Sequence, residues 1–177
     1  DKLPRLRNRR WVGVGRLDFN TTGLMLFVTD GELANRLMHP SRQIDREYSC
    51  RIRGGVSARQ IRELSEGLIL DGKTCRFETI RARGGRGTNR WYDVVVREGR
   101  YREVRRLWAA VDCTVSRLTR IRYGPIQLPR GLRRGTSMDL DAEQIQELCE
   151  LVEMPVPQLV GKQAMRGART KPSGRRR

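Results

Sequence analysis

The sequence is poor in the residue patterns that build metal sites, disulfide frameworks and membrane spans. It has one histidine, His39, and four cysteines that lie far apart and form no C-x-x-C pair. This spacing argues against a zinc ribbon and a disulfide scaffold, so we expect reduced, mostly buried thiols. The longest apolar runs, such as Leu24 to Val28, are far shorter than the roughly 20 residues of a membrane-spanning helix. We therefore expect no metal and no membrane partner.

Acidic residues are also too few to balance the charge of the basic residues. The 177 residues include 37 Lys and Arg against 20 Asp and Glu, which gives a net charge of +17. The last twelve residues hold six of the positive charges and no acid, so the remainder still carries +11. A field of this sign concentrates polyanions and makes their binding salt-dependent. Nucleic acid is therefore the first candidate partner, and an anionic membrane surface is a weaker second one.

The periodicity of the apolar residues predicts one α+β domain, whose mixed, mainly antiparallel sheet is flanked by helices. Strands are expected at residues 11–14, 24–29, 46–54, 74–83, 90–97 and 113–124. Helices are expected from Asp30 to Pro40, after Ser57, over 100–111 and over 141–152. The proline- and glycine-containing segment 125–135 reads as a loop.

The segment 100–111 combines an apolar stripe with a basic one. The apolar stripe at helical spacing consists of Val104, Leu107, Trp108 and Val111. The basic stripe beside it consists of Arg102, Arg105 and Arg106. The apolar stripe predicts the face that packs on the core, and Arg105 borders it at the rim.

Asp18 lies in the segment GRLDFNTTG, between two strand-like runs. Taken alone, an Asp in a polar loop usually caps a turn, and this reading is favoured on local grounds. The preceding GVGR is too short for the G-x-G-x-x-G loop of a dinucleotide site. Neither feature by itself indicates an enzyme.

Three separated segments, read together, change this balance. GRLD at 15–18, REYSCRI at 46–52 and EGRYREVRRLW at 98–108 resemble, in this order, the active-site motifs of the RsuA/RluB branch of pseudouridine synthases. The likeness is strongest to the RluB type, which acts on large-subunit ribosomal RNA. It implies a pseudouridine synthase fold with a basic RNA cleft, and isomerisation of uridine in a ribosomal RNA stem-loop without cofactor or metal.

The resemblance also assigns roles to individual residues. Asp18 matches the catalytic carboxylate, which attacks the ribose carbon or abstracts a ribose proton, and the sequence does not choose between these. Arg105 matches the basic residue that pairs with this carboxylate. Tyr48 matches the aromatic that lies against the extruded uracil.

Further contacts to the RNA follow from the same motifs. Arg16 is expected to fill the gap left by the flipped nucleotide or to contact its phosphate. Val104 and Leu107 are expected to form the apolar wall of the pocket. Arg102 and Arg106 are expected to bind the RNA beside Arg105.

Each of these assignments has a plain structural alternative. Tyr48 would otherwise be a strand residue that packs inward, and Arg105 one more solvated arginine. Arg16 would hold the loop through a salt bridge. Core packing alone would explain Val104 and Leu107 equally well.

The likeness extends from Trp11 to about Met154, and it predicts three parts of the chain. Members of this branch usually begin with a small RNA-binding domain, to which nothing here corresponds. Residues 1–10 are therefore expected to be a linker from a missing N-terminal domain, 11–154 the catalytic domain and 155–177 a basic, flexible tail.

Two other functions remain open at this point. One is a ribosome-assembly factor that keeps the fold and binds RNA without catalysis, and the other is a basic protein of the membrane surface. The joint presence of Asp18, Tyr48 and Arg105 favours the enzyme. We expect a cytoplasmic monomer.

Overall fold

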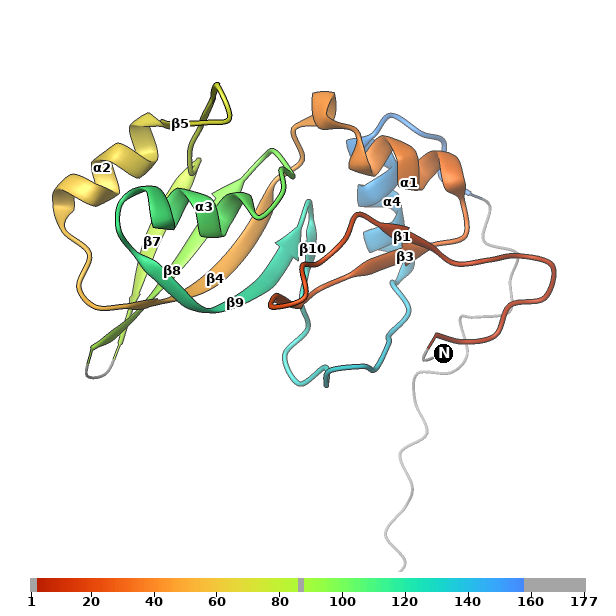
Figure 1. Cartoon of the computed structure of the whole chain (residues 1–177). Coiled ribbons are helices and arrows are strands. Elements are labelled where there is room, and N and C mark those ends of the chain that lie inside the picture. Colours follow the sequence, from red (N-terminus) through yellow and green to blue (C-terminus); the bar gives the residue numbers. More distant parts are fainter. Residues whose placement is uncertain (1–2, 86–87, 158–177) are drawn as a thin grey trace, which may run out of the picture.

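The centre of the protein is a six-stranded mixed sheet (Figure 1). The computed structural model describes residues 3–85 and 88–157. The strands of the sheet are β2 (Thr22–Gly23), β4 (Arg46–Arg53), β7 (Thr79–Gly84), β8 (Asn89–Val96), β9 (Thr114–Tyr123) and β10 (Ile126–Gln127). Their order is β10-β9-β4-β8-β7 with antiparallel neighbours, and β2 joins β9 in parallel. The predicted α+β class with a mainly antiparallel sheet is confirmed.

Two short antiparallel pairs accompany the central sheet. One pairs β1 (Val12–Val14) with β3 (Leu26–Val28), and the other pairs β5 (Leu68–Leu70) with β6 (Lys73–Cys75). The β1–β3 pair lies at the same end of the molecule as the first and last helices (Figure 1). The loop that leaves β1 therefore starts at one end of the molecule and reaches β9 through β2.

Three helices begin where the sequence supplies a capping side chain. They are α1 (Gly31–Met38) at Asp30, α2 (Ala58–Glu66) at Ser57 and α4 (Ala142–Leu151) at Asp141. Each cap accepts a hydrogen bond from a first-turn N–H that has no intrahelical partner, which stabilises a helix by about 0.5–2 kcal/mol. The remaining helix, α3 (Glu103–Ala110), starts after Arg102, whose backbone is left-handed (φ 49°) and whose side chain makes no cap. At the start of α3, Glu103 N–H donates to Arg100 O and Arg100 N–H donates to the Glu103 carboxylate.

The apolar core consists of two clusters. The Trp108 cluster joins the sheet to α2 and α3, and Trp108 packs against Phe77 and Tyr92 with ring centroids 5.5 and 5.3 Å apart. It contains the predicted stripe of Val104, Leu107, Trp108 and Val111, all buried. Burial of each such side chain contributes about 1.5–3 kcal/mol.

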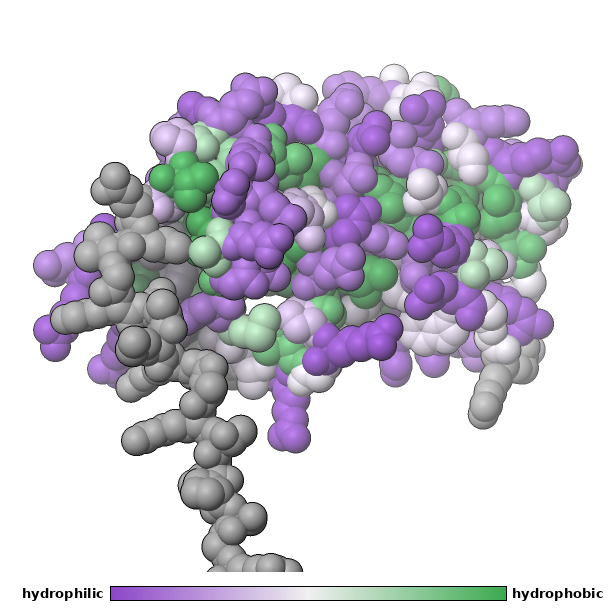
Figure 2. All heavy atoms as spheres, turned by 180° about the vertical axis from the view of Figure 1, so that it is seen from behind, coloured by the Kyte–Doolittle hydropathy of each residue, from purple (hydrophilic) through white to green (hydrophobic). Residues whose placement is uncertain are grey.

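The second cluster, called the Tyr123 cluster, packs α1 and α4 against β1, β3 and the end of β9. Leu37, Tyr123 and Leu148 are among its fully buried members. Strands β4 and β9 run from one cluster to the other, so the middle of these strands lies between the two halves (Figure 1). The reverse side of the molecule is largely hydrophilic, with scattered apolar areas (Figure 2).

Some local expectations were wrong in detail. The strand expected at 74–83 is two strands, β6 and β7, because Phe77 leaves the sheet, donates its N–H to Leu64 O and is buried against Trp108. The expected loop at 125–135 begins with the short strand β10.

All four cysteines are free and buried, as predicted. No helix in the described part of the chain is long and apolar enough to span a membrane. The tail expected at 155–177 lies outside the described residues from 158 onward.

Candidate active site

The loop that carries Asp18 connects β1 to β2. Its apex is a turn in which Thr21 N–H donates to Asp18 O over 2.9 Å. Asp18 is partly buried, whereas the next residue, Phe19, is fully exposed. At the end of the loop, Gly23 (φ +109°) lies so close to β9 that a Cβ there would be 2.1 Å from the carbonyl oxygen of Arg120. Only glycine therefore lets β2 pair with β9 and hold this loop against the sheet.

Arg105 ties the Asp18 loop to α3 and β9. Its Nη2 donates to Asn20 O over 2.7 Å, and its Nη1 donates to Val115 O over 2.8 Å. Burial lowers the pKa of the Arg105 guanidinium, Arg102 lowers it further, and the charge of Asp18 opposes this change. Among the residues that the structure describes, no ion pair within 4.0 Å joins Arg105 to Asp18. Arg105 thus fixes the loop backbone without a direct ion pair to the Asp18 carboxylate.

Tyr48 lies on β4 opposite Arg120 of β9, at the middle of the sheet. It is partly buried and packs against the Trp108 cluster. Burial raises the pKa of the Tyr48 hydroxyl, Arg120 and Arg46 oppose this rise, and the negative charge of Asp18 adds to it. The charge of Asp18 acts on both Tyr48 and Arg105, and Arg105 contacts the Asp18 loop at Asn20 O, so the structure brings residues of the three motifs near one another.

Arg120 is a central residue of the site that sequence reasoning missed. It is only 2% exposed, and its Nε donates to Leu24 O over 2.8 Å. Its Nη1 lies 3.5 Å from Arg16 O, so its contacts lie on both sides of Asp18 in the chain. Its guanidinium also lies 5.3 Å from the ring centre of Tyr123. An arginine within an alternating strand gave no signal of this inward position.

A second buried arginine, Arg46, supports the same ring from β4. Its guanidinium lies 5.0 Å from the ring centre of Tyr123, and its Nη2 donates to the Tyr123 hydroxyl over 3.2 Å. Its Nη1 donates to Arg97 O over 2.7 Å. Cation–π contacts and hydrogen bonds to carbonyls offset part of the cost of burying these charges. The floor of the site therefore carries fixed positive charge.

The other predicted site residues fall into different environments. Arg16 is exposed, and Arg102 is partly buried beside Arg105. Val104 and Leu107 are 5% and 0% exposed within the Trp108 cluster, in agreement with the core-packing alternative.

Arg106 is directed to a different partner. Both of its Nη atoms donate to Asp71, over 2.8 and 2.7 Å, at the turn between β5 and β6. This bidentate pair uses the fork of the guanidinium. The structure thus brings Arg105 to the Asp18 loop and separates its sequence neighbour from it.

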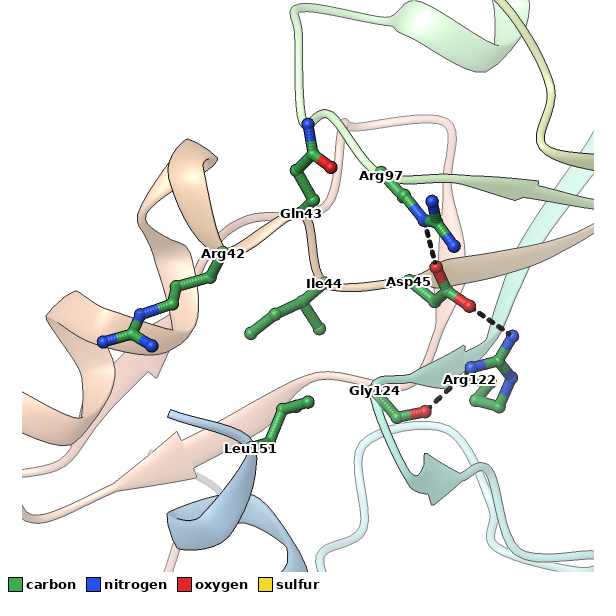
Figure 3. Close-up of a pocket in the computed structure, with 8 residues that line it drawn as sticks. All are labelled: Arg42, Gln43, Ile44, Asp45, Arg97, Arg122, Gly124 and Leu151. Carbon is green, nitrogen blue, oxygen red and sulfur yellow. Dashed lines mark hydrogen bonds and ion pairs between the residues drawn. The ribbon is translucent and has the colours of Figure 1, made fainter. Parts of the chain in front are cut away.

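Two other features lie apart from these residues. One is a pocket whose lining includes Asp45 (Figure 3). Arg97 Nε and Arg122 Nη2 lie 2.9 and 3.7 Å from the Asp45 carboxylate. Gly124 O accepts a hydrogen bond from Arg122 in the same wall. None of the predicted site residues lines this pocket, and its charged side chains are already in ion pairs.

The other feature is a group that could ligate a metal ion. Cys75, Glu98 and Glu103 place one ligand atom each within 4.8 Å of one another. Arg100 forms an ion pair with Glu98, and its backbone N–H donates to Glu103 over 3.4 Å. A guanidinium in this position competes with a cation for the carboxylates.

Comparison with known proteins agrees with the motifs. Residues 1–110 match the family model described as RNA pseudouridylate synthase. The chain is 57% identical over 155 residues to the ribosomal large subunit pseudouridine synthase B of Escherichia coli K12 and to that of Shigella flexneri. These matches cover 88% of this chain and 53% of each relative, so the chain spans about half their length.

A solved structure supports the fold. A crystal structure of a pseudouridylate synthase superposes with a TM-score of 0.69 at 26% identity, over 78% of this chain and 59% of that one. The family match covers more than half of the chain. The chain therefore belongs to the RNA pseudouridylate synthase family.

Proposed function

We propose that this chain isomerises uridine to pseudouridine at a specific site of large-subunit ribosomal RNA. One observation carries the proposal: Arg105 donates a hydrogen bond to the loop that carries Asp18, and the charge of Asp18 acts on both Arg105 and Tyr48, which come from two other segments. The relatives named above are large-subunit enzymes, which supports the choice of RNA. The net charge of +17 suits a polyanionic substrate.

The proposed reaction needs a carboxylate and a uracil that is kept in the site while it turns. It needs neither an oxidant nor a group donor. The bond between ribose C1′ and uracil N1 breaks, the uracil turns, and a new bond joins C1′ to C5. C5 loses its proton and N1 gains one, so the atoms and electrons balance within the nucleotide. Ionised Asp18 either attacks the ribose carbon or removes a ribose proton. Arg105 keeps the Asp18 loop in place through its hydrogen bond to Asn20 O.

The remaining residues position the RNA. Tyr48 presents its ring to the extruded uracil, which recovers part of the stacking lost when the base leaves the helix. Arg16 occupies the gap or contacts its phosphate, and Arg102 contacts the backbone beside Arg105. Val104 and Leu107 support this wall from within the core. Arg106 acts through its pair with Asp71, which holds α3 to the β5–β6 turn.

We infer a cytoplasmic monomer that acts on a ribosomal RNA stem-loop and uses no metal or cofactor. Ribosomal RNA is the substrate class named for the relatives. The proposed reaction exchanges one C1′–N1 bond for a C1′–C5 bond and moves protons. A non-catalytic RNA-binding role on the same fold has no observation in its favour.

The test is chemical mapping of pseudouridine by carbodiimide labelling. Ribosomal RNA from cells with and without the gene identifies the modified position, and the purified chain then acts on that stem-loop in vitro. Asp18→Asn and Asp18→Ala should abolish isomerisation while RNA affinity and the circular dichroism spectrum stay nearly unchanged. Substantial turnover by Asp18→Ala would remove Asp18 from the chemistry. RNA binding without any labelled product by the parent chain would favour the non-catalytic role.

A further inference from the structure

Phe19 is the most exposed large apolar side chain among residues 3–85 and 88–157. Its exposure is 102% of the reference value, against 72% for Tyr101 and 69% for Ile69. It directly follows Asp18 in the turn that Thr21 N–H closes on Asp18 O. Leaving a phenylalanine in water forgoes the free energy that burial would provide. Its complete exposure next to Asp18 makes this aromatic a candidate for contact with a ligand.

The loop that displays Phe19 is anchored on both sides. After Phe19, Asn20 O accepts a hydrogen bond from Arg105, and the Thr22 hydroxyl lies 3.0 Å from that of Thr119 on β9. Before it, Arg16 O lies 3.5 Å from Nη1 of the buried Arg120. The ring is therefore presented by a backbone that the sheet and α3 already hold. A preorganised aromatic loses little conformational entropy when it is covered.

The surroundings of Phe19 select the kind of partner. The exposed residues nearest to it in its own loop, Arg16 and Asn20, are polar, so the ring stands among polar side chains of that loop. A nucleobase offers a π-face for an isolated ring, and its phosphate suits the adjacent cation. If Asp18 acts on an extruded uridine, the nucleotides on either side of it remain at the mouth of the site, next to residue 19.

We propose that Phe19 is a stacking contact for the base that neighbours the isomerised uridine. This inference rests on the proposed function, since it uses the position of the uridine at Asp18. Phe19 holds the flanking RNA and so fixes the extruded nucleotide over the carboxylate. It takes no part in proton transfer.

The experiment compares Phe19→Ala, Phe19→Leu and Phe19→Trp in the full chain. The RNA is the large-subunit hairpin in which the parent chain makes pseudouridine or, if it makes none, a hairpin with one unpaired uridine in its stem. Loss of one base–aromatic stack should raise the Kd of Phe19→Ala by about 5- to 150-fold. Phe19→Trp should restore binding, and Phe19→Leu should not, because it keeps apolar area without a ring. Ile69→Ala, an exposed apolar truncation on β5, is the matched control and should bind like the parent.

A fluorescent base locates the contact. With 2-aminopurine on the 5′ or the 3′ side of the uridine, the parent complex should quench one of the two positions, and Phe19→Ala should relieve that quenching. Binding of Phe19→Ala within twofold of the parent, or equal quenching in both, overturns the inference. Phe19→Leu binding as well as Phe19→Trp also overturns it. Absence of pseudouridine with the parent chain would instead count against the proposed function, because the binding and fluorescence measurements do not require turnover.

Discussion

Replacement of Glu103 by glutamine should change how the stability of this protein depends on pH. Glu103 is the first residue of α3 and is only 5% exposed. Burial raises the pKa of its carboxyl group to about 7 from an ordinary value of 4.5, with Arg100 N–H opposing and Glu98 adding to the rise. Between these two values the folded state holds a proton that the unfolded state has lost. The free energy of unfolding should therefore fall as the pH rises from 4.5 to 7 and then level off.

The size of the effect follows from the two pKa values. At 1.36 kcal/mol per pKa unit, the difference between about 7 and 4.5 corresponds to about 3 kcal/mol at most. The glutamine side chain is neutral at every pH and has nearly the same shape as the protonated glutamate that it replaces. Glu103→Gln should therefore match the parent near pH 4.5 and exceed its stability by up to about 3 kcal/mol at pH 8.

Urea unfolding at a series of pH values from 4.5 to 8.5 measures this difference. The background is favourable, because the chain has a single histidine, which is exposed. Glu66→Gln, at an exposed position at the end of α2, is the control and should leave the pH profile of the parent unchanged. A difference between Glu103→Gln and the parent that is the same at pH 5 and pH 8 would refute the reasoning.

Three further predictions follow from the site. Tyr48→Phe should retain most RNA binding and Tyr48→Ala should lose binding and activity, and equal behaviour of the two would return Tyr48 to a packing role. Arg105→Ala should slow single-turnover isomerisation at saturating RNA far more than it weakens binding, and Arg105→Lys should recover only part of the rate because it lacks the planar fork; a larger loss in binding than in rate would contradict this. Gly23→Ala should destabilise the fold by more than about 2 kcal/mol in urea unfolding, because its Cβ meets the β9 backbone, whereas Gly54→Ala, at a similar positive φ in open space, should cost less. Equal losses at the two glycines would show that β2 moves freely away from β9.

Local rules were sufficient where an element depends on its own residues. Asp30 and Ser57 mark the starts of α1 and α2, because a capping oxygen acts on N–H groups within the same turn. The apolar stripe of α3 identified the face that is buried, because helical geometry fixes which residues share a side. The motif order likewise identifies Asp18, Tyr48 and Arg105 as candidate site residues.

Contacts between distant segments were not predictable in the same way. Arg105 and Asn20 are 85 positions apart, and only the tertiary fold brings α3 to the loop between β1 and β2. Arg106 had the same sequence environment as Arg105, yet it pairs with Asp71. Asp71 lies in the turn between β5 and β6, a strand pair that the sequence did not predict.

The sequence by itself therefore determined the main helices and strands, the capped starts of α1, α2 and α4, the basic character and the candidate motif residues. Tertiary structure alone decided which arginines of β9 face inward. Strict alternation along β9 would place Val115 and Tyr123 on the face opposite Leu118 and Arg120, but all four are buried. Two register shifts between β4 and β9 reverse the alternation. A one-residue shift turns every following side chain to the other face, and the pairing of two strands, not the residues of one, sets where it occurs.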